Sequence, residues 1–165
     1  MRKRSLWFIV LVAAIGLLAT GSLVNAKNTT VTLTARLSGA QEVPPADPDG
    51  SGKADVVIDV EAGRVCFDIK LSDTGTPNRG HIHEGAAGVN GPIVVPFFEL
   101  RIPPADPGAP ASDPRNDALE DGRLQDCVSA DPALLARIVA NPENFYVNVH
   151  NARFPGGNLR CQLEP

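Results

Sequence analysis

Three histidines, His81, His83 and His150, are the residues whose types and spacing best suit chemistry, and the 165-residue chain contains no other histidine. His81 and His83 lie two positions apart in a stretch, residues 80–85, that is expected to form a β-strand. Their side chains would then project from one face, with Cα atoms ~6.6 Å apart. His150 ends another expected strand near the C-terminus. Three neutral imidazoles with an open coordination position suit copper or zinc.

Two interpretations of these histidines stay open at the level of sequence. In the first, the three side chains bind one metal ion, with copper as the candidate; the divalent order for imidazole sites then predicts tighter binding of Cu(II) than of Zn(II). Such binding should weaken as the pH falls through about 6.5, because each ligand must lose its proton. In the second, the histidines are ordinary strand residues that hydrogen-bond to the backbone. All three could meet only if the two strands lie side by side or face each other.

The elements that must position the histidines are short strands. Alternation of apolar and polar residues, with turn residues between the runs, predicts eight of them. Their ranges are 30–37, 54–60, 64–71, 80–85, 92–98, 124–128, 145–150 and 158–163. One helix is expected over 131–140, with Asp131 as its cap and Pro132 in its first turn. Together these elements indicate an all-β fold, an antiparallel sandwich or barrel with one short helix.

The N-terminus has the pattern of an export signal. Residues 1–26 combine a basic start, an apolar run from Leu6 to Leu18 and small residues before Lys27. We therefore expect a signal peptide at 1–26, a single domain at 27–165, and a secreted, periplasmic or cell-envelope location. The alternative is an uncleaved membrane anchor, since the stretch from Leu6 to Val24 carries no charge and nearly suffices to span a bilayer. A membrane is expected as a partner only in that case.

Charge excludes some partners. The full chain has a formal charge of −4. Without the three basic residues of the expected signal, 12 basic residues remain against 19 acidic ones, a net −7. A surface this acidic argues against nucleic acid and against anionic membranes as partners.

Three cysteines, Cys66, Cys127 and Cys161, remain in the mature chain. In an exported protein this count favours one disulfide and one leftover thiol. Spacing alone leaves all three pairings open.

Three segments carry a family resemblance: LTARLSGAQEVPP at 33–45, HIHEGAAGVNGPIVV at 81–95 and YVNVHNARFPGGNLRCQL at 146–163. They resemble the CHRD domain, named after the animal protein chordin and also found in many bacterial secreted proteins. The resemblance covers residues 31 to 163 and implies an immunoglobulin-like β-barrel. It further implies a non-enzymatic binding or matrix module for an unknown extracellular or cell-surface ligand. Bacterial members of the family imply a Cys66–Cys127 disulfide.

The CHRD fold is also faintly similar to that of copper–zinc superoxide dismutases. The HIHE segment that starts at His81 resembles their copper-binding HVHE strand, and His150 resembles a further copper histidine. Cys161 stands where their late disulfide cysteine would be. The chain departs from them in having no histidine to bridge copper and zinc, no zinc ligand set, and Asn158 in place of an arginine. These departures argue against dismutase activity but leave a single copper site open.

Overall fold

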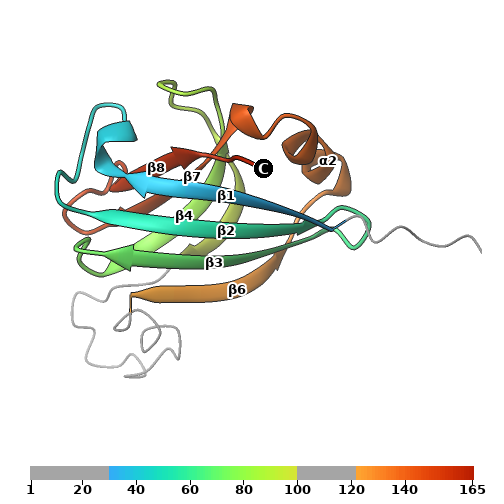
Figure 1. The fold of residues 1–165 in the computed structure, drawn as a ribbon, viewed down its shortest axis with the longest axis horizontal. Coiled ribbons are helices and arrows are strands. Elements are labelled where there is room, and N and C mark those ends of the chain that lie inside the picture. Colours follow the sequence, from blue (N-terminus) through green and yellow to red (C-terminus); the bar gives the residue numbers. More distant parts are fainter. Residues whose placement is uncertain (1–29, 100–121) are drawn as a thin grey trace, which may run out of the picture.

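The computed structural model describes residues 30–99 and 122–165, which form one rolled β-sheet with a short helix at one end (Figure 1). The expected signal peptide at 1–26 lies outside the described residues. The strands are β1 (Thr30–Ser38), β2 (Ser51–Asp59), β3 (Arg64–Ser72), β4 (Pro77–Glu84), β5 (Ile93–Glu99), β6 (Arg123–Ser129), β7 (Phe145–Asn151) and β8 (Leu159–Gln162). The helix is α2 (Pro132–Ala140), and two short 3-10 turns are η1 (Gly39–Gln41) and η2 (Pro142–Asn144).

All eight strands belong to one antiparallel sheet with the order β5-β4-β7-β8-β1-β2-β3-β6. The sheet is nearly closed: Phe67 of β3 stacks on Phe97 of β5 with ring centroids 4.5 Å apart. In Figure 1, β1, β2, β3 and β6 form the front layer, and the other four strands lie behind them. The expected all-β class with a single helix is confirmed for the described residues.

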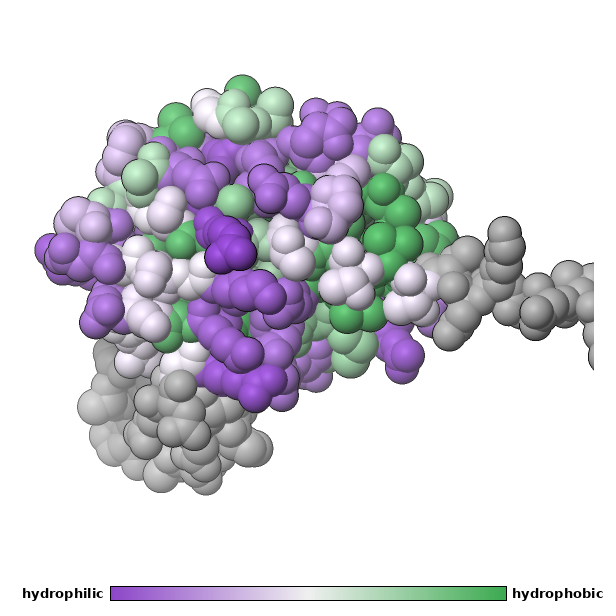
Figure 2. Space-filling view, viewed as in Figure 1, coloured by the Kyte–Doolittle hydropathy of each residue, from purple (hydrophilic) through white to green (hydrophobic). Residues whose placement is uncertain are grey.

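The core lies between the two layers and follows from the period of two along each strand. In most strands one face is apolar and buried, and the other meets solvent or loops; in β6 only Leu124 is buried. Figure 2 shows that the face seen in Figure 1 mixes hydrophilic and intermediate residues, with a hydrophobic group toward the right. The fully buried aliphatic residues of the core include Ala54, Val56, Ile58, Val65, Ile69, Ile82, Val95, Val147, Val149 and Leu159.

Two strands begin three residues earlier than expected. β4 begins at Pro77 rather than at Gly80, because Pro77 and Arg79 already pair with β7. β2 begins at Ser51 rather than at Ala54, because Ser51 and Gly52 still pair with the end of β3. The buried Asp47 carboxylate ends the preceding loop by accepting hydrogen bonds from the backbone N–H groups of Asp49 and Gly50. This side-chain turn lets pairing start early.

Helix α2 has the expected cap. The Asp131 side chain accepts a hydrogen bond from the Ala133 N–H at 2.7 Å, and Pro132 occupies the first turn. The helix ends at Ala140, and Leu135 and Ile138 bury its apolar face in the core. No helix among the described residues has the length and apolar character needed to cross a membrane.

A disulfide joins Cys66 of β3 to Cys127 of β6, which face each other in the strand register. This is also the pair that the family resemblance implies. The third cysteine, Cys161, is buried and carries a free thiol.

Candidate metal centre

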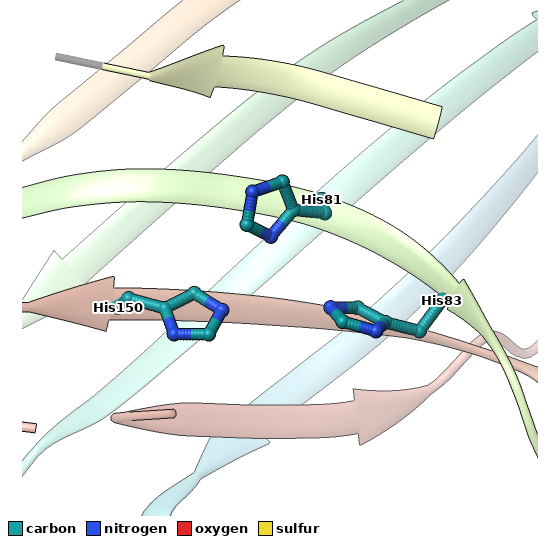
Figure 3. Close-up of side chains that lie close together, drawn as sticks. All are labelled: His81, His83 and His150. Carbon is teal, nitrogen blue, oxygen red and sulfur yellow. The ribbon is translucent and has the colours of Figure 1, made fainter. Parts of the chain in front are cut away.

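The three histidines come from two neighbouring strands. His81 and His83 lie on β4 and His150 lies on β7, which pair antiparallel. Figure 3 shows their rings gathered above the same face of these strands, with the other layer of the sheet behind. The ligand nitrogens, one from each ring, all lie within 4.8 Å of one another. The adjacency that the sequence could not show is therefore present.

Strand alternation directs the histidines away from the core. Ile82, Val147 and Val149 point inward and are fully buried. The intervening residues consequently project from the outer face. On that face the register places His81 opposite Asn148.

Loops cover this outer face and hold two of the rings. His83 Nδ1 donates a hydrogen bond to the Gly91 carbonyl at 2.9 Å. His150 Nδ1 donates one to the Pro155 carbonyl at 3.1 Å. Gly91 is required where it stands, because a Cβ there would lie 1.7 Å from the Glu84 carbonyl oxygen. His81 and His150 are left only 5% and 6% exposed.

These hydrogen bonds determine which nitrogens remain free to bind a ligand. A carbonyl only accepts, so the proton sits on Nδ1 of His83 and of His150, and each Nε2 keeps its lone pair. Both Nε2 atoms, and Nδ1 of His81, are buried without a hydrogen-bond partner among the described residues. A backbone carbonyl behind a histidine is the usual second-shell support of a metal ligand. At bond lengths of 2.0–2.1 Å the three nitrogens need separations of roughly 3.3–3.6 Å, so the rings must move closer together when a metal binds.

The environment keeps the rings neutral, as metal ligands must be. Burial, together with the neighbouring His150 and His83, lowers the pKa of His81 to about 4. Burial likewise lowers the pKa of His150 to about 4, against the hydrogen bond to Pro155. The pKa of His83 is also lowered, mainly by burial.

The purely structural interpretation accounts for only part of this arrangement. It explains the two Nδ1 bonds to backbone carbonyls. It leaves three buried ring nitrogens unpaired, and each such group costs about 1–3 kcal/mol. A metal ion would satisfy all three at once.

Other side chains of the site were not found by sequence reasoning. Tyr146 stacks on His83 with centroids 4.8 Å apart, and Asn148 donates a hydrogen bond to the buried Glu42 carboxylate at 3.3 Å. The spacing of Tyr146 and Asn148, four and two positions before His150, could have placed them on its face. Glu42 lies in a Pro-rich loop and gave no such signal.

Glu84, the last residue of the HIHE segment, points elsewhere. It forms an ion pair with Arg137 of α2 and lies half-exposed. It therefore anchors the helix to β4 rather than joining the three imidazoles.

The metal-free protein is expected to lose stability as the pH falls from about 6.5 toward 4. The unfolded chain takes up protons at ordinary histidine pKa values, whereas folded His81 and His150 resist protonation until about 4. Glu42 opposes this trend, because burial raises its pKa to about 7 and the folded state binds its proton more readily than the unfolded state. With one histidine offset by Glu42, the net loss is on the order of 3 kcal/mol. Urea unfolding at pH 7, 6, 5 and 4 measures it.

The Glu42→Gln variant serves as the control for this pH dependence. It removes the opposing group, so its stability should fall more steeply over the same range. A flat profile in both proteins would contradict the lowered histidine pKa values. Those values also move the expected pH range for loss of metal below the 6.5 that ordinary histidines predict.

Comparisons with known proteins identify a family for most of the chain. The family model described as the CHRD domain matches residues 33–163. No curated protein and no solved structure matches the chain.

Proposed function

The chain belongs to the CHRD domain family, and we propose that it is an exported binding module whose ligand is a single copper ion held by His81, His83 and His150. One observation carries the proposal: three buried ring nitrogens without partners lie within 4.8 Å of one another. The family itself supports a module of unknown ligand, and the metal is our assignment of that ligand.

Copper is favoured over other ions by the ligand chemistry. The set is three neutral imidazoles with no carboxylate, which suits copper and zinc and is poor for calcium or magnesium. Among divalent ions of the first row, copper binds such a set most tightly. Backbone carbonyls behind two of the rings fix the tautomers that copper or zinc would need.

Binding rather than catalysis is the activity we propose. The mature chain, at net −7, would repel rather than attract an anionic substrate such as superoxide. The signal-like segment at 1–26 and the Cys66–Cys127 disulfide support a location outside the cytoplasm. The same acidic surface argues against nucleic acid as a further partner.

Titration of the mature chain with Cu(II) tests the proposal. Protein produced without a histidine tag should bind one Cu(II) per chain, more tightly than Zn(II), and its spin-resonance spectrum should show couplings to imidazole nitrogens. Metal content after purification gives an independent reading. Substoichiometric binding, or a spectrum without nitrogen couplings, would rule out the site.

A further inference from the structure

Arg160 of β8 is a buried cation whose hydrogen-bond acceptors, within residues 30–99 and 122–165, are all neutral. Its side chain is 1% exposed. It donates to the carbonyls of Ala86 and Val89 at 3.0 and 2.9 Å, and to the side-chain oxygens of Asn90 and Gln162 at 3.2 and 3.3 Å. Buried arginines normally pair with a carboxylate. The charge of this one is stabilised by dipoles but not cancelled.

Glu42 is a carboxylate that interacts electrostatically with Arg160, but it offsets the positive charge of Arg160 only in part. Burial raises the pKa of Glu42 to about 7 although Arg160 acts to lower it. The side chain of Glu42 accepts a hydrogen bond from Asn148 rather than from Arg160. In the described part of the chain, Arg160 is in no ion pair. Near neutral pH a substantial positive charge therefore remains beside the site.

Tyr146 connects this charge to the histidine cluster. The Arg160 guanidinium lies 3.5 Å from the centroid of the Tyr146 ring. The His83 imidazole lies 4.8 Å from the same centroid, with an angle of 8° between the rings. Because β7 lies between β4 and β8, the tyrosine ring is layered between the imidazole and the guanidinium. The result is a stack with a cation at one end and a candidate metal ligand at the other.

The same residues hold the backbone that orients His83. The Tyr146 hydroxyl accepts a hydrogen bond from the Gly91 N–H at 3.1 Å, and the Gly91 carbonyl accepts the His83 Nδ1 bond. Arg160 binds the preceding turn of that loop through Ala86 and Val89. The position of the His83 ring therefore depends on its stacking against Tyr146, and the direction of its Nδ1 hydrogen bond depends on the loop that Tyr146 and Arg160 hold in place.

We propose that Arg160, acting through Tyr146, is a positioning residue that shifts the metal preference of the three-histidine site toward monovalent copper. The inference rests on the proposed copper function. A fixed positive charge disfavours a divalent ion more than a monovalent one, and three neutral ligands do nothing to offset the difference. For a unit charge on the order of 10 Å away at an effective dielectric near 20, the ratio of Cu(I) to Cu(II) affinity should rise about tenfold.

The test measures both copper affinities by chelator competition at pH 7, with Cu(I) kept reduced by ascorbate without oxygen. In Arg160→Met the ratio of Cu(I) to Cu(II) affinity should fall about tenfold. Arg160→Lys retains the charge and should restore most of the wild-type ratio. Gln162→Leu is the matched control, because it removes one hydrogen bond of Arg160 and the bond to the Gly85 carbonyl while leaving the Arg160 charge in place. It should move both affinities together.

An equal loss of both affinities in Arg160→Met would overturn the proposal and leave Arg160 a loop anchor. If circular dichroism shows that Arg160→Met does not fold, the Glu42→Gln variant tests the electrostatic effect instead. Glu42 is partly ionised at pH 7, so its neutralisation should raise the ratio of Cu(I) to Cu(II) affinity; an unchanged ratio would reject the inference. Failure of wild-type protein to bind either ion would instead reject the copper function itself.

Discussion

Replacing His83 or His150 with alanine is expected to abolish the one-to-one copper site and to weaken Cu(II) affinity by more than about 100-fold. Losing a residue that merely hydrogen-bonds to a metal ligand costs about 10–100-fold in affinity, and losing the ligand itself should cost more. Each side chain supplies one of the three converging nitrogens. Two imidazoles that remain cannot enclose the ion, and the nitrogen couplings in the spin-resonance spectrum should change accordingly. Isothermal titration and copper spin resonance on wild type and variants measure the effect.

Conservative variants separate loss of a ligand from loss of fold. His150→Gln refills most of the space and keeps a donor for the Pro155 carbonyl, so it should stay folded yet lose the site. Arg153→Ala changes the same loop at a residue whose guanidinium lies over the Phe154 ring, and it should bind copper normally. If the histidines are only structural, the histidine variants will unfold more easily while weak copper binding persists unchanged.

Local sequence signals predicted most of the elements because those signals are short in range. The alternation at 64–71 and the Asp131-Pro132 start of the helix depend on residues within one strand or one turn. They reappear as β3 and α2. The early start of β2 was missed because it depends on pairing with Ser72 and on the Asp47 turn, which lie outside the strand itself.

Sequence reasoning predicted only part of the site, because the rest depends on contacts between segments far apart in the chain. His81 and His83 share a face through strand geometry alone, so the sequence sufficed for them. The approach of His150 requires that β4 pair with β7, a choice made by long-range packing in the sheet order. Arg160 and Glu42 have no spacing relation to the histidines, and only the folded sheet and its covering loops bring them near.

Removing the disulfide, by Cys66→Ser with Cys127→Ser, should lower the free energy of unfolding by about 4 kcal/mol. The two cysteines are 61 residues apart in sequence, so the bond restricts a long loop of the unfolded chain. It also ties down β6, which pairs only with β3 at one end of the sheet order. Denaturant unfolding of wild type and the double variant measures the loss, and non-reduced peptide mapping verifies the pair.

Cys161→Ala is the control, because it removes the free buried thiol and leaves the bridge intact. It should cost much less than the double variant, and an equal cost would show that core packing rather than the bridge is responsible. The histidines lie on β4 and β7, several strands from β6 in the sheet order. Copper affinity of the folded double variant should therefore match wild type. A parallel loss of affinity would mean that closure of the sheet at β6 helps to shape the site.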